Sequence, residues 1–195
     1  MSTNPIHRFS SQEYLALERA SPTRSEFYQG EIFAMAGASR AHNLITLNVG
    51  GYLNALLAEK PCEVYVSDMR VKVTLEELYT YPDVVVVCGE PVFEDEQGDT
   101  LLNPVLLIEV LSPSTKNYDR GEKFEMFRMI ETFREYLLIS QEKCHVEHFV
   151  KQLPDQWVMT ETNHLESLIS LTTINCDLPV RTIYQKVTLS NRGDG

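Results

Sequence analysis

Hydrophobic residues follow two kinds of pattern along this chain, and each pattern predicts a different element. Apolar residues at helical spacing predict helices over residues 10–20, 39–60, 114–133 and 179–187. Short runs that are alternately or continuously apolar predict strands over residues 62–74, 82–89, 104–112, 135–140, 144–150 and 156–162. Between residues 21 and 37, the pattern predicts two short strands joined at a hairpin corner, Gln29-Gly30.

The strands and helices together predict an α/β fold with a mixed central sheet flanked by helices. The runs at 82–89 and 104–112 are apolar at nearly every position, which is typical of strands buried on both faces. The short strands near the end of the chain predict an additional C-terminal antiparallel β region. A length of 195 residues suits a single domain. We expect its core to cover about 10–150 and an extension to cover 151–195.

The helix expected over residues 39–60 has a leucine stripe and two central glycines. The stripe consists of Leu44, Leu47, Leu53, Leu56 and Leu57. Gly50 and Gly51 each cost about 1 kcal/mol relative to alanine in a helix. Their presence predicts a close approach to a neighbouring element.

The overall charge restricts the partners of the protein. Seventeen Lys and Arg residues stand against 28 Asp and Glu, which gives a net charge of −11. Such a surface argues against broad, non-specific nucleic-acid binding but permits a small binding footprint. The first residues lack an apolar signal core, and no apolar run approaches the roughly 20 residues of a membrane helix. We therefore expect a cytoplasmic protein that does not interact with membranes.

The cysteines and histidines show no spacing typical of a metal site. No two of the four cysteines form a CxxC motif, and we expect all four to be free thiols in a reducing cytosol, namely Cys62, Cys88, Cys144 and Cys176. His145 and His148 lie three apart on an expected strand and therefore point to opposite faces. They are poor joint ligands.

Two acids in apolar strands are the first candidate functional residues. Asp83 begins the run "PDVVVV", and Glu109 lies inside the run "VLLIEVLS". A buried carboxylate is normally paired, protonated or bound to metal, because an isolated charge is costly in an apolar interior. If the two strands are neighbours, the acids could share Mg²⁺ or Mn²⁺. The alternative is two unrelated acids, one at a strand start and one paired with a basic residue.

Lys123 is the third candidate, because it lies on the apolar face of the helix expected over residues 114–133. Met126 and Phe127 follow it at helical spacing, which directs the lysine inward. It could then point at the end of the sheet where Glu109 lies. The alternatives are an i,i+4 pair with Asp119 or a lysine that extends its amine to solvent.

The segments "YPDVVVVCG" and "LLIEVLSPSTKNYDRGEKFEMFR" resemble the Uma-two family of predicted endonucleases. The resemblance extends to "GEIFAMAGASRAHN" and "VYVSDMRVKV", and it covers roughly residues 10–150. It implies the restriction-endonuclease-like fold of the PD-(D/E)XK superfamily. In that superfamily a lysine follows the second acid by two residues, but this chain has Leu111 there. Lys123 is the candidate for a lysine that has moved to the next helix.

The resemblance also implies roles for other residues. Asp83, Glu109 and the Val110 carbonyl would hold the metal, with Glu31 completing its shell. His42 would lie near the catalytic group. The residues expected to bind substrate are Asp68, which the resemblance suggests, and two basic residues of the segment 114–128, Lys116 and Arg120.

Two functions follow from this resemblance and remain open. The first is a Mg²⁺-dependent (or Mn²⁺-dependent) endonuclease that hydrolyses DNA phosphodiester bonds, with Lys123 as its catalytic lysine. The second is an inactive nuclease fold that serves as a binding or regulatory module. By analogy with the superfamily, we expect a homodimer in either case.

Overall fold

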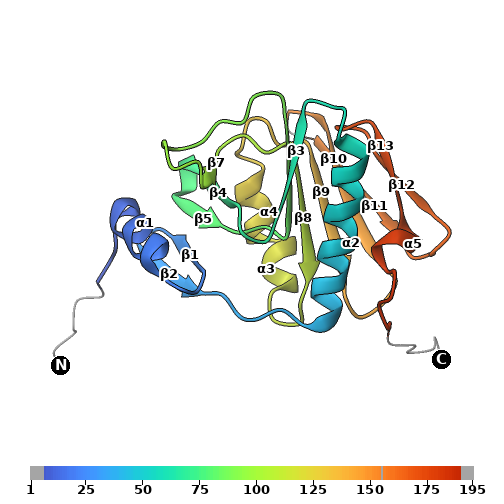
Figure 1. The fold of residues 1–195 in the computed structure, drawn as a ribbon, viewed down its shortest axis with the longest axis horizontal. Coiled ribbons are helices and arrows are strands. Elements are labelled where there is room, and N and C mark those ends of the chain that lie inside the picture. The colour runs from blue at the N-terminus through green and yellow to red at the C-terminus, as the bar shows by residue number, and fades with distance from the viewer. Residues whose placement is uncertain (1–6, 155, 190–195) are drawn as a thin grey trace.

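A six-stranded mixed sheet forms the centre of the protein (Figure 1). The computed structural model describes residues 7–154 and 156–189. The strand order is β11 (Gln156–Thr162), β10 (Val146–Leu153), β9 (Glu135–Ser140), β8 (Leu106–Leu111), β6 (Val84–Cys88) and β3 (Cys62–Val66). Strands β8 and β9 are parallel, and the other neighbours are antiparallel. This arrangement confirms the predicted mixed sheet.

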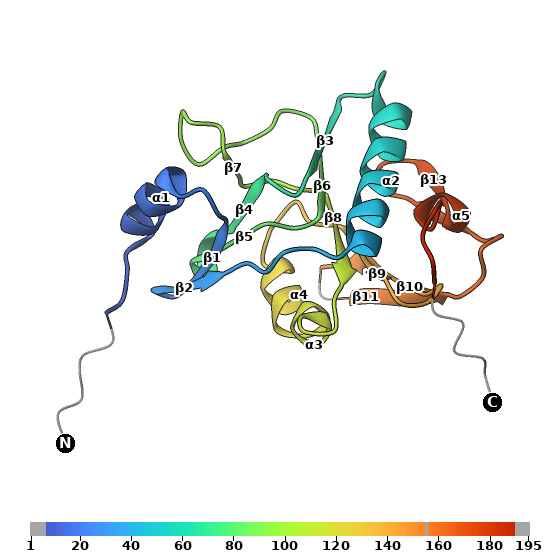
Figure 2. The ribbon, with the colours of Figure 1, turned by 60° about the horizontal axis from the view of Figure 1, so that its bottom comes forward.

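Two smaller sheets complete the β structure. The first has the order β2 (Glu31–Ala34), β1 (Ser25–Tyr28), β5 (Leu78–Thr80), β4 (Arg70–Val73) and β7 (Thr100–Leu101). The second is a hairpin of β12 (Leu168–Leu171) and β13 (Cys176–Pro179), which provides the expected C-terminal antiparallel region. Figure 2 shows β1 and β2 at one end of the molecule and the β12–β13 hairpin at the other.

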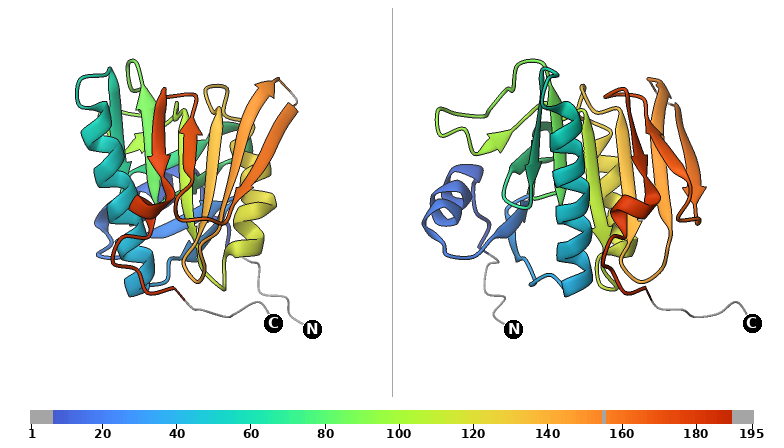
Figure 3. Two further views of the ribbon diagram at one scale, coloured as in Figure 1. Left: turned by 90° about the vertical axis from the view of Figure 1, so that its right-hand side faces the viewer. Right: turned by 45° about the vertical axis from the view of Figure 1, so that its right-hand side comes forward.

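The helices cover both faces of the central sheet. Helix α1 (Ser11–Ala20) packs beside β1, and a short 3₁₀ turn, η1 (Thr74–Glu76), precedes β5. Helix α2 (Arg40–Leu57) covers one face together with α5 (Val180–Ile183), as Figure 3 shows. Helices α3 (Lys116–Arg120) and α4 (Glu122–Phe127) lie on the other face. Within the described residues, no helix has the length and hydropathy to cross a membrane.

The valine run of β6 contributes to two separate cores. Val84 and Val86 pack with Ile45 of α2, whereas Val85 and Val87 pack on the side of α4. Successive side chains of a strand point to opposite faces, so a strand covered on both sides is apolar at every position. The prediction from the continuous apolar run is confirmed.

Local signals placed the first elements correctly. Ser10 caps α1 in a capping box with Glu13, since each side chain accepts a hydrogen bond from the other residue's backbone N–H. The corner between β1 and β2 falls at Gln29 and Gly30, whose φ angles are +45° and +90°. Two successive positive φ angles are typical of a type I′ turn, which matches the twist of a hairpin.

The buried face of α2 differs from the predicted leucine stripe. Leu47 and Leu56 are exposed, and Leu44 is only partly buried. The apolar residues that face the sheet are Ile45, Val49, Leu53 and Leu57. These four recur at every fourth position, so Leu53 and Leu57 of the predicted stripe face the sheet, whereas Ile45 and Val49 take the place of its other leucines.

The close approach predicted at the central glycines occurs at only one of them. A Cβ added to Gly50 would lie 2.4 Å from Cγ1 of Val66 on β3, whereas one added to Gly51 would meet nothing within 4 Å. Gly50 therefore allows α2 to lie against the edge of the sheet.

Three expected elements are interrupted or shorter in the structure. Residues 62–74 form two strands in different sheets, because the chain turns at Ser67, where φ is +58°. The helix expected over 114–133 is divided by Gly121 into α3 and α4, and it ends at Phe127. The expected terminal helix over 179–187 is reduced to α5.

The prediction of four free thiols is wrong for two of the cysteines. Cys62 and Cys88 lie opposite each other on β3 and β6, and they form a disulfide with a Cα–Cα distance of 4.0 Å. Cys144 and Cys176 are free. Twenty-six residues separate the bonded cysteines, so only the strand register brings them together.

Candidate active site

The register of β6 and β8 brings the two strand acids to the same place. Val84 lies opposite Ile108, and continuing this antiparallel register by one residue puts Asp83 opposite Glu109. Opposed residues of an antiparallel pair project from the same face. Leu107 and Leu111 lie two residues before and after Glu109, so their side chains share its face of the sheet, and they pack on the α4 side. Both acids therefore face α3 and α4.

Asp83 is held from two directions at the rim of the sheet. Its Oδ2 accepts a hydrogen bond from the Val110 backbone N–H at 2.7 Å. The same oxygen lies 3.1 Å from Nε2 of His42 in the first turn of α2. That turn is held by Ser39, whose hydroxyl accepts a hydrogen bond from the His42 N–H. The carboxylate is thus fixed in position while part of its side chain remains exposed.

Lys123 connects Glu109 to two further acids. Its ammonium lies 2.8 Å from Glu109 Oε1, 3.3 Å from Glu26 and 3.8 Å from Asp119. The lysine side chain is only 6% exposed, and Glu109 and Asp119 are equally buried. The structure contains both the Lys123–Glu109 pair and the i,i+4 contact with Asp119. One buried ammonium therefore faces three carboxylates, which we call the Lys123 cluster.

Glu26 belongs to the Lys123 cluster, although it was not among the residues predicted for the site. Phe27 packs against α1, so its neighbour Glu26 points to the opposite side of β1, toward Lys123. The Thr80 hydroxyl on β5 donates a hydrogen bond to Glu26. The available signal was an acid inside a short strand, next to a core phenylalanine. Recognising it required knowing that β1 joins β5 and lies near α4.

Glu31 lies at the start of β2 and is outside the Lys123 cluster. Its side chain is half exposed, and its Oε1 is 4.0 Å from the guanidinium of Arg8. Hairpin pairing places it opposite Tyr28 at the corner of the β1–β2 hairpin. The structure thus brings a different acid of the same hairpin, Glu26, to Lys123.

The three residues expected to bind substrate lie in different surroundings. Asp68 is exposed at the β3–β4 turn, 3.5 Å from Arg24. Lys116 is exposed at the start of α3. Arg120 is held by Glu147 of β10, with its Nε 2.8 Å from Oε1. This ion pair anchors α3 to the central sheet.

Burial and like charges shift the pKa values of the Lys123 cluster. Burial raises the pKa of Glu109 well above its usual range, with Asp119 and Asp83 raising it further against the opposing effect of Lys123. Burial also raises the pKa of Asp119. Although burial disfavours a charged amine, the carboxylates around Lys123 raise its pKa well above the usual value. The lysine therefore remains a cation, and the acids around it exceed what one cation balances.

The acids supply oxygen ligands suited to a hard divalent cation. Among residues 7–154 and 156–189, no three His, Cys, Asp or Glu side chains are arranged to hold a metal ion. Mg²⁺ commonly uses one or two carboxylates, with water and substrate phosphate as its other ligands. Asp83 and Glu109 can supply such a pair, and Glu109 Oε1 also lies 2.8 Å from the Lys123 ammonium. The residues present fit a two-carboxylate site.

The fold and the paired strand acids define a restriction-endonuclease-like protein. The structure resembles that of "a putative nuclease belonging to DUF820" from Anabaena variabilis, with a TM-score of 0.73. The match covers 90% of this chain and 97% of the other at 17% identity, and it supports the fold alone.

The chain belongs to the Uma2 family, described as "Putative restriction endonuclease", whose model matches residues 11–181. This finding confirms the resemblance recognised in the sequence. Two relatives are uncharacterized proteins of Synechocystis. The chain is 42% identical to sll1609 over 78% of its own length and 86% of that protein. It is 31% identical to slr1290 over 93% and 94% of the two lengths.

Proposed function

We propose that this protein is a metal-dependent endonuclease that hydrolyses phosphodiester bonds in DNA. The observation that carries the proposal is the buried Lys123, which contacts Glu109 beside the rim carboxylate Asp83. Buried acids with raised pKa values beside a specific cation are typical of active sites. The family and the fold support the same reaction class.

Asp83 and Glu109 would hold Mg²⁺ or Mn²⁺ in this proposal. The metal, when bound, would polarise the phosphate and lower the pKa of the attacking water. The hydrogen bond from Val110 N–H and the contact with His42 hold Asp83 in one orientation. His42 would thus act as a positioning residue.

Lys123 would orient the attacking water and offset the negative charge that develops on the phosphate. Its environment suits this role, because three carboxylates keep the amine protonated. Glu26 and Asp119 restrict the ammonium to the space in front of Glu109. A fixed cation requires little rearrangement during the reaction, which is the basis of electrostatic catalysis.

The rival function is an inactive nuclease fold that serves as a binding or regulatory module. Leu111 favours this rival, because it occupies the position where the superfamily normally has a lysine. Lys123 would then serve only to balance the buried acids. Fold similarity cannot separate the two possibilities, since one fold supports many functions.

The DNA contact, cellular location, oligomeric state and domain organisation of the protein are part of the same proposal. With a net charge of −11, we propose a DNA contact limited to the area around the metal. We propose a cytoplasmic homodimer, since two sites can cut the two strands of a duplex. We further propose that the chain is a single domain with residues 151–195 as an extension of its core.

The test is a metal titration followed by a cleavage assay on plasmid and branched DNA. We expect Mg²⁺ or Mn²⁺ to bind and stabilise the wild type, and the Asp83→Asn and Glu109→Gln variants to lose both effects. Their cleavage should fall about 100-fold or more, because each loses a group that acts on the reacting phosphate. Asp177→Asn, an exposed change on β13, is the matched control and should leave metal binding and cleavage unchanged.

Lys123→Arg separates catalysis from charge balance, because it keeps the cation and changes its shape. We expect a folded protein that binds metal but cleaves at least about tenfold more slowly, since a displaced cation stabilises the transition state less. Unchanged cleavage would refute the role of Lys123. A wild type that neither binds metal nor cuts DNA would refute the proposed nuclease activity.

A further inference from the structure

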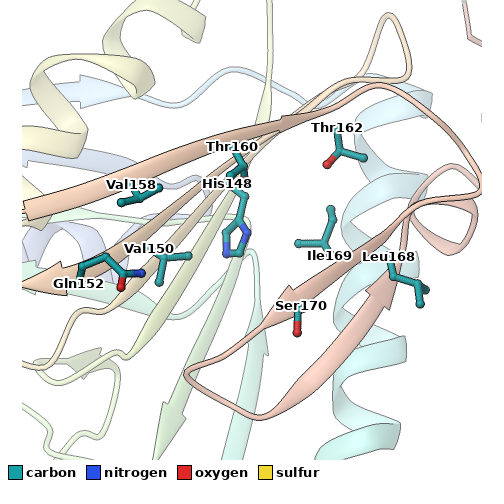
Figure 4. A pocket seen from close by; sticks show the side chains of 9 residues that line it. All are labelled: His148, Val150, Gln152, Val158, Thr160, Thr162, Leu168, Ile169 and Ser170. Carbon is teal, nitrogen blue, oxygen red and sulfur yellow. The ribbon is translucent and has the colours of Figure 1, made fainter.

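A hollow of about 280 Å³ opens between the β10–β11 hairpin and strand β12 (Figure 4). It is distinct from the candidate active site. His148 and Val150 line it from the side of β10 that also carries Val146, which packs in the core beneath α2. Glu109 projects from the opposite face of the same sheet. The hollow and the Lys123 cluster are therefore separated by the sheet itself.

A fixed histidine lies inside this hollow. Figure 4 shows the His148 imidazole pointing from β10 into the space in front of β12. Its side chain is only 9% exposed, and its Nε2 lies 3.0 Å from Glu135 Oε1. The backbone N–H groups of Thr172 and Thr173 donate hydrogen bonds to Glu135 at 2.9 and 3.0 Å. The backbone of Thr172 and Thr173 thus fixes the Glu135 carboxylate, and Glu135 fixes the orientation of the His148 imidazole.

This arrangement determines which ring nitrogen is free. Burial raises the pKa of Glu135, but hydrogen bonds from His148 and Thr173 outweigh it and lower the pKa below its usual value. An ionised carboxylate only accepts hydrogen bonds, so Nε2 carries the proton. Nδ1 forms no hydrogen bond with any described residue. In the neutral imidazole with its proton on Nε2, Nδ1 has a lone pair that can accept a hydrogen bond from a donor in the hollow.

The walls of the hollow are aliphatic on both sides, with hydroxyl groups between them. Val150 and Val158 lie on the face of the hairpin, and Leu168 lies on β12. Thr160 and Ser170 supply hydroxyls that can donate or accept. Among the residues that the structure describes, no Lys, Arg, Asp or Glu lines the hollow. Such a lining favours an uncharged ligand with apolar faces and a polar edge.

We propose that this hollow binds an uncharged, flat heteroaromatic ring that donates a ring N–H to Nδ1 of His148, as a nucleobase does. The ring lies between the valines of the hairpin and Leu168, with its polar edge near Thr160 and Ser170. The volume falls just below the roughly 300–1,000 Å³ of typical small-molecule pockets, which suits one ring system better than a whole nucleotide.

The test uses uracil as the probe and 1,3-dimethyluracil as its matched control. The two rings have similar shape, but the control has no ring N–H. We expect uracil to shift backbone amide NMR signals of β10, β11 and β12, with a Kd of about 1 mM for so small a ligand. We expect 1,3-dimethyluracil to bind about tenfold more weakly, the cost of one lost hydrogen bond.

Two variants locate the binding. His148→Gln keeps a donor for Glu135 but removes Nδ1, and it should weaken uracil binding about tenfold. Leu168→Lys changes an exposed rim residue that the fold does not need, and it should also weaken binding. Leu75→Lys, which changes another exposed leucine, away from the hollow, should have no effect.

Three results would overturn the proposal. These are absence of shifts at 20-fold the expected Kd, equal binding of the two probes, or shifts confined to α3 and α4. If His148→Gln does not fold, the comparison of uracil binding by Leu168→Lys and by Leu75→Lys is sufficient to test the proposal. Neither metal nor DNA is present in these measurements, so their outcome is independent of the proposed nuclease activity.

Discussion

Removing the charge of Lys123 should destabilise the protein strongly and in a pH-dependent way. At an effective dielectric constant of about 20, unit charges 2.8 Å apart attract by roughly 6 kcal/mol, and Lys123 also faces Glu26 and Asp119. Desolvation offsets much of this attraction. Removing one partner of a buried ion pair typically costs about 3–5 kcal/mol, because the other charge is left uncompensated. We expect Lys123→Met to fall in that range.

The assay is thermal and urea unfolding of Lys123→Met at several pH values. A loss of about 3–5 kcal/mol corresponds to a decrease in Tm of about 10 °C for a chain of this size. Lys143→Met, a change at an exposed turn between β9 and β10, is the matched control and should lie within about 0.5 kcal/mol of the wild type.

The pH dependence follows from the raised pKa of Glu109. A carboxyl whose pKa is higher in the folded state than in the unfolded state destabilises the fold as the pH rises above its unfolded value, about 4.3. Without the ammonium, the pKa values of Glu109 and Asp119 should rise further. The destabilisation should therefore be largest near pH 8 and should shrink as the pH falls toward 5, where the folded protein binds protons.

Divalent metal should replace part of the missing charge. If Mg²⁺ binds to the acids that surround Lys123, it should raise the Tm of Lys123→Met more than that of the wild type. A loss of stability below about 1 kcal/mol, or one that is equal at pH 5 and pH 8, would refute the charge-balance argument. Either result would mean that the acids of the cluster are neutral or solvated in the folded protein.

The remaining predictions concern the α2 contact and the disulfide. Gly50→Ala should destabilise the fold by about 1–3 kcal/mol, because the new Cβ would meet Val66. Gly51→Ala should instead stabilise it by up to about 1 kcal/mol, because alanine favours a helix and nothing obstructs the new Cβ. Urea unfolding of the two variants measures both changes. A destabilising Gly51→Ala would contradict the assignment of Gly50 as the contact point. Cys62→Ser should lower the free energy of unfolding by about 2–4 kcal/mol, because the disulfide with Cys88 is lost. A thiol reductant should cause the same loss in the wild type and no further loss in the variant.

The elements predicted correctly from the sequence depend on neighbours close along the chain. The capping box of Ser10 and Glu13 and the turn at Gln29-Gly30 involve residues within four positions of each other. The prediction of β6 as a buried strand required only its run of apolar residues. Such signals are present in any short window of the sequence, so they need no knowledge of the rest of the fold.

The errors arose where a distant element decides the outcome. Leucines suggested the buried side of α2, but the sheet beneath it selected the side that carries Ile45 and Val49. Residues 62–74 were predicted as one strand, yet the turn at Ser67 assigns them to two sheets. Periodicity identifies an element and does not specify what will cover it.

For the candidate site, too, the sequence identified the residues and the tertiary structure brought them together. Asp83 and Glu109 can be selected from the sequence, because an acid in an apolar run requires a compensating partner. Lys123 follows from the apolar face of its helix. Their convergence depends on the pairing of β6 with β8 and on the position of α4, and these are tertiary features.

By itself, the sequence of this protein determined the types of most elements, the burial of the central strands and the presence of two acids in apolar strands. Only the tertiary structure decided that Glu26, and not Glu31, meets Lys123, and that Cys62 meets Cys88. The physical reason is that periodicity and capping act over a few residues. Strand register and layer packing, by contrast, join residues that lie from 26 to 97 positions apart.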